Sequence, residues 1–552
     1  PVGDLAATAA LPRRGPGIVL RPALAQCLET GVVLAEGTRV ALMPDSGGVA
    51  AALAKRLAQR GVEVLELDPD RDRAGLCAQI DGWLEAGPIH GLYWLPAMDI
   101  ETPCESLDDW REQLDLRVKR LASVARALYE QLAAPERFLI SGTRLGGRHG
   151  YDDGGAVSPM GGAVCGFTKA FARERGDALV KAVDFAASRK TAALADILIE
   201  ETLRDPGAVE IGHAMERRWA VALREQPLAE NDGGMVMGPD SVFAITGAAG
   251  SIVAAITADL AAAGGTVYLL DLAPQPDADN EDIRRVASDR DNLRRDIFER
   301  MKAAGERATP ALVEKHVAGL EREAAALAAI DAIDAAGGRA VYCQVDLTDP
   351  QAVDAVVERI RDEQGRIDVL LHAAGLEISR PLPDKPDAEF DLVFDVKCNG
   401  WFNLRRAIGD MPLGAVVAFS SIAGRFGNQG QSDYSAANDL LCKSMSALRH
   451  SHPGTRGLAL DWTAWADIGM ASRGSIPTIM AAAGIDMLAP DAGIPLIRRE
   501  LTASDFHGEL VVAERLGVLL EERDAAGGFD TASLDLDARP MLGRATAMSI
   551  AA

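Results

Sequence analysis

Two hydroxyl side chains, Ser421 and Tyr434, stand thirteen positions apart (434 − 421) in the segment SSIAGRFGNQGQSDYSAAN. Reduction of a carbonyl group requires a proton donor and a hydrogen bond to the developing alkoxide, roles that suit Tyr434 and Ser421 respectively. A free tyrosine has a pKa of about 10, so it needs a neighbouring cation to work near neutral pH. Lys397, in FDVKCNGWFNL, is expected to lower that pKa. Asn438 follows Tyr434 by one helical turn and is expected to face the same site.

A glycine-rich turn upstream, TGAAGSI at 246–252, joins a predicted strand to a predicted helix. Glycine lets such a turn close against a pyrophosphate, and the N-terminus of the following helix supplies free N–H groups. Such turns are common, and Val253 stands where the third glycine of a dinucleotide fingerprint is expected. The turn residues predicted to bind a dinucleotide are Thr246, Gly247, Ala249, Gly250, Ser251 and Ile252.

Three later segments strengthen the prediction of a dinucleotide site. Asp271 ends the next predicted strand, 21 residues after Gly250 (271 − 250), where an acidic side chain can bind the ribose hydroxyls. Asp346 ends a further strand and is placed to contact adenine, and HAAG at 372–375 supplies a close-packed backbone beside the nicotinamide ribose. The predicted cofactor contacts beyond the turn are Asp271, Asp346, Leu347, Ala373, Ala374 and Gly375.

Strands and helices alternate along the chain, and one architecture occurs twice. Each half opens with an apolar strand, a small-residue turn and an alanine-rich helix: RVALMPDSGGVAAALAKRLAQRG and, later, SVFAITGAAGSIVAAITADLAAAGG. Each half also has a strand that ends in serine, RFLISG at 137–142 and AVVAFSS at 415–421. The alternation predicts an α/β fold with two Rossmann-like, doubly wound parallel sheets, which bind ligands at the carboxyl ends of their strands.

The two predicted halves differ where chemistry would occur. Position 154, which corresponds to Tyr434 by its offset from Ser141, is Gly, and the turn PDSGG is a poor phosphate cradle. Lys169 is open to two interpretations, a relic of catalysis or a solvated lysine on a helix face, and we expect the second. The first half therefore reads as a degenerate copy with a structural role. We place a structural subdomain at 1–235, a catalytic subdomain at 236–520 and a linker at 521–552.

A charged segment at about 274–337 interrupts the second half. Apolar residues recur there at helical spacing, at Ile283, Val286, Leu293, Ile297 and Met301. This periodicity predicts two or three amphipathic helices. Two interpretations are open: a solvated insertion packed on its own domain, which we expect, and a docking surface for a partner domain.

The composition limits the functions that the chain can have. Lys and Arg number 57 against 81 Asp and Glu, a net charge of −24 that argues against binding nucleic acid or an anionic membrane by charge. No apolar run reaches about 18 residues, so no membrane span is predicted. The seven cysteines are scattered without a C-x-x-C pair, which favours reduced thiols in a cytoplasmic protein and argues against a structural metal.

The region 241–515 resembles the short-chain dehydrogenase/reductase superfamily and, within it, the ketoreductase domains of modular polyketide synthases. HAAG, FSSIAG, YSAAN and DWTAWADIGM (461–470) carry the resemblance. Most short-chain reductases have a lysine four residues after the tyrosine, whereas polyketide ketoreductases exchange the lysine and asparagine positions. Asn438 and Lys397 match the exchanged arrangement, and Tyr434 and Ser421 match the family's tyrosine and serine. The degenerate first half is similar to the structural subdomain of that family.

A finer resemblance is to reductase domains of polyunsaturated fatty acid synthases and related iterative synthases. It is carried by the charged insertion, by GFTKAFARE at 166–174 and by FHGELVVAERLG at 506–517. The resemblance implies a β-ketoacyl substrate on the phosphopantetheine arm of an acyl carrier protein, with neighbouring synthase domains as partners. The residues expected at the substrate lid are Gln431, Phe426, Trp462, Trp465 and Met470, and for the last three a role in the core is equally open.

Three departures from the family matter. Val253 replaces a glycine and is expected to loosen the pyrophosphate turn. Asp271 repels a 2′-phosphate and favours NADH, whereas the family favours NADPH, so both cofactors stay open. LEIS follows HAAG where one stereochemical class has Leu-Asp-Asp, so the hand of the alcohol is not assigned. The predicted function is a β-ketoacyl reductase domain; the alternatives are a free-standing short-chain alcohol dehydrogenase and an inactive nucleotide-binding scaffold.

Overall fold

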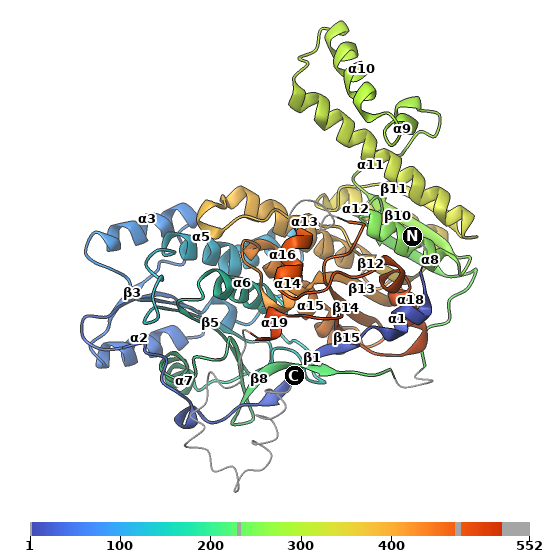
Figure 1. Cartoon of the computed structure of the whole chain (residues 1–552). Coiled ribbons are helices and arrows are strands. Elements are labelled where there is room, and N and C mark those ends of the chain that lie inside the picture. Colours follow the sequence, from blue (N-terminus) through green and yellow to red (C-terminus); the bar gives the residue numbers. More distant parts are fainter. Residues whose placement is uncertain (1–2, 229–232, 470–475, 522–552) are drawn as a thin grey trace.

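The chain folds around one continuous sheet of 15 strands (Figure 1). The structure, a computed structural model, describes residues 3–228, 233–469 and 476–521. In spatial order the strands are β11 (Arg339–Gln344), β10 (Thr266–Asp271), β9 (Val242–Thr246), β12 (Ile367–His372), β13 (Leu413–Ser421), β14 (Arg456–Trp462), β15 (Gly508–Val512), β1 (Arg14–Leu20), β8 (Arg217–Glu225), β7 (Glu210–Ala214), β6 (Leu179–Phe185), β5 (Phe138–Thr143), β4 (Gly91–Trp94), β2 (Arg39–Met43) and β3 (Glu63–Glu66).

The predicted α/β fold with two Rossmann-like parallel sheets is confirmed, and the two sheets are joined edge to edge. Strands β9–β15 form one parallel block and β2–β7 the other. Antiparallel pairing of β15 with β1, β1 with β8 and β8 with β7 connects them. Because three successive antiparallel steps separate the blocks, the strands of the two halves point in opposite directions.

In the second half the strand order reverses between β9 and β12. The strands β10 and β11 lie on the β9 side, and the strands β13, β14 and β15 lie on the β12 side. Ligands of open α/β sheets bind at such a switch point, outside the carboxyl ends of the strands. The helices of this half, apart from the insertion, are α8 (Ser251–Ala261), α12 (Pro350–Gln364), α13 (Asp387–Ile408), α14 (Ile422–Phe426), α15 (Ser432–Ser451), α16 (Ile476–Ala482), α17 (Pro490–Gly493), α18 (Leu496–Ala503) and α19 (Val518–Glu521).

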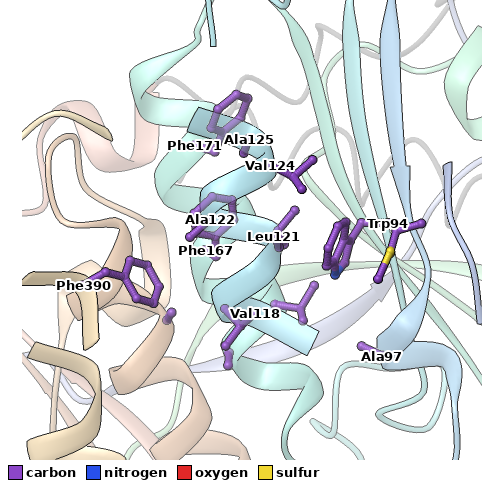
Figure 2. Close-up of a cluster of buried hydrophobic side chains, with 14 of the residues drawn as sticks. Trp94, Ala97, Val118, Leu121, Ala122, Val124, Ala125, Phe167, Phe171 and Phe390 are labelled. Atoms are coloured by element: carbon purple, nitrogen blue, oxygen red, sulfur yellow. The ribbon is translucent and has the colours of Figure 1, made fainter. Parts of the chain in front are cut away.

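The first half packs tightly against the helices of the second. Its helices are α1 (Leu5–Ala10), α2 (Val49–Gln59), α3 (Arg73–Leu84), α4 (Leu107–Leu114), α5 (Arg120–Ala127), α6 (Gly161–Glu174) and α7 (Thr191–Leu203). Figure 2 shows apolar side chains of α5 and the preceding turn between Trp94 on one side and Phe167, Phe171 and Phe390 on the other. Phe390 belongs to α13, and its ring centroid lies 6.5 Å from that of Phe167 on α6. One apolar core therefore spans both halves.

Lys169, on α6, corrects a prediction. It is not a solvated lysine: its side chain is fully buried, and Nζ lies 2.8 Å from Oδ2 of Asp439 on α15 and 3.4 Å from Oε1 of Glu210. The expectation was wrong because the face of α6 that carries Lys169 packs against α15 of the other half, a contact that no local sequence pattern shows.

The insertion forms three helices, α9 (Glu281–Arg285), α10 (Arg290–Ala303) and α11 (Pro310–Ala335), which project from the body (Figure 1). The five predicted apolar positions do gather in one small cluster, with Met301 at its margin. The later part of α11 joins the core of the catalytic half through Ala326 and Ile333. No helix among the described residues is long and apolar enough to cross a membrane.

Candidate active site

The glycine-rich turn lies between β9 and α8, at the switch point of the sheet. Gly247 has φ +69°, and a Cβ there would lie 3.0 Å from Cα of Ala374, so a side chain would be both strained and crowded. The Thr246 hydroxyl accepts the N–H groups of Ala373 (2.9 Å) and Ala374 (3.0 Å) and so ties the turn to HAAG. No side chain of the described residues caps α8, whose first N–H groups are thus available to an anion. The site fits a dinucleotide.

Val253 does not open the turn, contrary to expectation. The turn is closed by a hydrogen bond from the Gly250 N–H to the Gly247 carbonyl (3.0 Å). The Val253 side chain is buried in the apolar core below. The other turn residues face the segment before position 470: Ser251 Oγ accepts the Gly469 N–H (3.1 Å), and a Cβ on Gly469 would lie 2.6 Å from Cδ1 of Ile252.

Asp271 lies beside the turn, and its predicted contact with the ribose stays a prediction. One carboxylate oxygen accepts the N–H of Ala249 (2.9 Å) and the other that of Ala273 (3.0 Å), so the side chain also holds the turn in shape. Asp346 is exposed at the end of β11, where it accepts the N–H and hydroxyl of Thr348 (2.8 and 2.7 Å). Leu347 is buried beside it.

The four predicted catalytic side chains come together from three elements. Lys397 on α13 donates to Oδ1 of Asn438 (2.8 Å) and to the carbonyl of Phe419 (2.6 Å). Asn438 in turn donates to the carbonyl of Tyr434, one turn earlier on α15 (2.8 Å). Ser421 ends β13, and its Oγ accepts the N–H of Ala423. A Cβ on Gly375 would meet Cε of Lys397 at 2.8 Å, so HAAG lies against this centre.

The expected lowering of the Tyr434 pKa is wrong for the protein alone. Burial raises the pKa of Tyr434, and the charge of Glu377 adds to the rise, while hydrogen bonds with Asn438 and Ser421 oppose it. Lys397 Nζ lies 5.4 Å from the centroid of the tyrosine ring and donates its hydrogen bonds elsewhere. Burial lowers the pKa of Lys397 itself to about 8. Tyr434 is therefore fully protonated at neutral pH, the form that a proton donor needs.

The predicted lid residues divide into one polar residue at the site and a set in the core. Gln431, just before α15, donates to Oε1 of Glu377 (3.0 Å) and to Oγ of Ser379 (3.1 Å), which places the LEIS loop beside Tyr434. Phe426 is buried in a cluster with Ile485 and Leu516, and its place at the lid stays a prediction. Trp462 and Trp465, for which a core role was equally open, are buried in a second apolar cluster with ring centroids 5.1 Å apart, and Met470 lies outside the described residues.

The sequence reasoning missed an ion pair directly before the tyrosine. Lys385 and Asp433 are both fully buried, with Nζ 2.6 Å from Oδ2, and Lys385 also donates to the carbonyl of Ile378 (2.9 Å). The other oxygen of Asp433 accepts the N–H of Tyr434 (2.8 Å). Burial raises the pKa of Asp433 to about 6 against the pull of Lys385. Asp433 was visible in SDYSAAN, but its partner lies 48 positions away, beyond any local pattern.

Residues 241–467 match the family model of the KR domain. This region belongs to the KR family, the ketoreductase domains of polyketide synthases. Polyketide synthase ThaG of Burkholderia thailandensis is 33% identical over 182 residues, 32% of this chain and 3% of that protein. A polyunsaturated fatty acid synthase protein of Thraustochytrium sp. is 36% identical over 149 residues, 26% of this chain and 5% of that protein. The chain thus spans only a small part of the synthases it matches.

Solved structures extend the likeness to both halves. A-type ketoreductases from a modular polyketide synthase superpose with a TM-score of 0.68 at 19% identity, covering 96% of each chain. An N-terminal ketoreductase from the macrolactin assembly line gives 0.65 at 17% identity, covering 92% of each chain. This likeness shows that the first half shares the fold seen in those structures. The match to the KR domain indicates an oxidoreductase and implies a nicotinamide cofactor.

Proposed function

We propose that the chain is the β-ketoacyl reductase of a multienzyme synthase and converts a carrier-bound β-ketoacyl thioester to the β-hydroxyacyl thioester. The observation that carries the proposal is the Lys397–Asn438–Tyr434 chain of contacts, which meets Ser421 at the carboxyl ends of the strands beside the cofactor turn. This arrangement joins a proton donor to a dinucleotide site, as reduction of a carbonyl requires.

The residues act on one oxygen atom. NAD(P)H, when bound, supplies the hydride to the β-carbon. Tyr434 donates its phenolic proton to the β-carbonyl oxygen, and the Ser421 hydroxyl donates a hydrogen bond to the same oxygen while negative charge develops there. Lys397, oriented by Asn438, offsets the charge left on the phenolate and is the route by which a proton returns to it. Burial of this centre strengthens each of these interactions.

The turn around Gly247 and the uncapped N-terminus of α8 would hold the pyrophosphate. Asp271 would bind the ribose. The Asp271 carboxylate supports NADH, and the family supports NADPH. The relatives are large synthases, which supports a carrier protein and neighbouring domains as partners. All seven cysteines lie among the described residues and none forms a disulfide, which supports a cytoplasmic protein.

The test is the loss of nicotinamide absorbance with a β-ketoacyl pantetheine thioester, measured with NADH and NADPH in parallel. Turnover confirms the reductase, and the ratio of kcat/KM between the two cofactors shows the influence of Asp271. Oxidation of small alcohols at equal efficiency, without a need for the pantetheine arm, would favour a free-standing dehydrogenase. Cofactor binding without turnover, even on a carrier-bound substrate, would contradict the proposal and favour the scaffold.

A further inference from the structure

Helix α6 belongs to the first half, yet its residues contact the segment that carries the catalytic tyrosine. The two helices α6 and α15 cross at close range, because Gly162 and Gly166 lie at the contact. A Cβ on Gly162 would lie 2.6 Å from Cγ of Lys443 and 2.7 Å from the carbonyl of Asp439, and a Cβ on Gly166 would collide with the carbonyl of Ser435. Ser435 directly follows Tyr434, so the backbone of α6 sets how closely α15, the helix that carries Tyr434, packs against the first half.

At the end of α6, Glu174 binds two loops that flank the active site. One carboxylate oxygen accepts the N–H of Gly430 (3.1 Å), and the other accepts the N–H of Leu382 (2.9 Å). Gly430 precedes α15, and Leu382 follows the LEIS loop. The loops also bind each other directly, from the Arg380 N–H to the Gly430 carbonyl (2.8 Å). Hydrogen bonds to a charged acceptor are the stronger kind, so one carboxylate holds both loops in register.

Lys169 adds a fixed point at the residue that follows the catalytic asparagine. Its ammonium pairs with Asp439, which follows Asn438 on α15, and neither side chain is exposed by more than 1%. Burial would raise the pKa of Asp439, but Lys169 and Lys443 hold it at about 2, so the carboxylate stays charged. Both partners are buried, and breaking a buried ion pair is strongly destabilising, so the pair resists rotation of α15 about its own axis.

We propose that α6 of the first half is a positioning element of the reductase centre, with Glu174 fixing the two flanking loops and Lys169 fixing the helix of Tyr434. The inference rests on the proposed function. It assigns a task to the segment GFTKAFARE, from Gly166 to Glu174. Neither residue touches the reacting atoms; both act through the placement of Tyr434 and Asn438.

The test compares Glu174→Gln with a matched carboxylate elsewhere in the first half. Asp45 also binds two backbone N–H groups, those of Val49 (3.1 Å) and Ala50 (2.7 Å), at the start of α2. Glutamine has one acceptor oxygen and cannot bind both loops. We expect Glu174→Gln to lower kcat at least tenfold, with the cofactor Kd within twofold of the wild type, and Asp45→Asn to leave kcat unchanged. Glu174→Asp, which keeps both oxygens on a shorter arm, should recover part of the loss.

Amide hydrogen exchange supplies a readout that does not depend on turnover. Exchange at Leu382, Gly430 and Tyr434 should accelerate in Glu174→Gln and not in Asp45→Asn. A kcat within twofold of the wild type in Glu174→Gln would overturn the inference. If that variant does not fold, Glu174→Asp and Lys169→Arg carry the test, and wild-type kcat in both would overturn it. If the wild-type protein reduces no thioester, the proposed function is refuted instead. The exchange rate at Tyr434 in Glu174→Gln then decides the inference.

Discussion

The two halves open with the same strand, turn and helix, yet their turns use N–H groups in different ways. In the first half the carboxylate of Asp45 accepts the first N–H groups of α2, and Asp99 accepts those of Ser46 (2.9 Å) and Gly47 (3.1 Å). In the second half no described side chain caps α8. A phosphate cannot bind the first turn, because its donors are already paired and two carboxylates would repel it. A few side chains thus decide which copy binds a cofactor.

The same contrast holds at the ends of the central strands. Ser421 of β13 is partly accessible beside Tyr434, whereas Ser141 of β5 is fully buried and its hydroxyl lies 2.8 Å from that of Thr168 on α6. The serine of the first half is therefore held inside the packing of its own half. The difference teaches that the first half uses this place for packing, whereas the second half keeps its serine accessible beside Tyr434.

The largest effect should come from the proton donor, which only the second half retains. Tyr434→Phe removes the phenolic proton and leaves the ring in place, so we expect kcat to fall by about 10² to 10⁴. The cofactor Kd should stay within twofold, because Tyr434 lies on α15 and not on the turn. Stopped-flow absorbance and equilibrium titration measure the two quantities. A variant that turns over at the wild-type rate would place the acid elsewhere and break the comparison.

A matched pair of glycines tests the two turns directly. Gly247 and Gly48 both have positive φ, +69° and +89°, so alanine strains either backbone. A Cβ at 247 would lie 3.0 Å from Cα of Ala374, whereas at 48 the nearest atom is Cγ2 of Thr191 at 4.0 Å. We expect Gly247→Ala to weaken cofactor binding about tenfold or more, and Gly48→Ala to lower the free energy of unfolding by roughly 1 kcal/mol with binding intact. Equal effects on cofactor Kd would show that turn geometry does not distinguish the halves.

Lys397, which belongs to the second half, should make the reduction sensitive to pH. Its pKa in the folded protein is about 8, so it loses its charge as the pH rises through that value. We expect kcat for reduction to be level below pH 8 and to fall above it, and Lys397→Met to lower kcat at least tenfold and abolish this limb.

The effect of Lys397 on stability has the opposite sign. The folded pKa lies below the ordinary value of 10.5, so between about pH 8 and 10.5 the unfolded chain binds more protons and the free energy of unfolding rises with pH. The destabilisation that comes from burying the charged Lys397 side chain is fully present below pH 8. Lys397→Met should therefore be no less stable than the wild type at pH 7 in urea titrations. A destabilised variant would mean that Lys397 stabilises the fold and does not serve the reaction.

How far the sequence predicts the molecule follows from the range of each signal. Alternating strands and helices, the glycine turn and the Ser421–Tyr434 spacing are local patterns, and the fold and the meeting of the four side chains were predicted from them. Lys385 with Asp433 and Glu174 with its two loops were not, because each pairing joins distant segments. Burial was also misjudged at Lys169, which was expected in solvent, because the residues that surround it are distant in sequence.

The smallest effect is expected from the carboxylates that close the turn of the first half. Asp45→Asn with Asp99→Asn removes two negative charges near that turn, yet an amide oxygen still accepts N–H groups there. We expect the unfolding free energy to fall by about 1 to 2 kcal/mol and the cofactor to bind with a stoichiometry of one, as in the wild type. Isothermal titration with NADH and NADPH measures the stoichiometry. A second bound cofactor would show that these two charges alone had kept the first half from being a cofactor site, and that the rest of its cradle is intact.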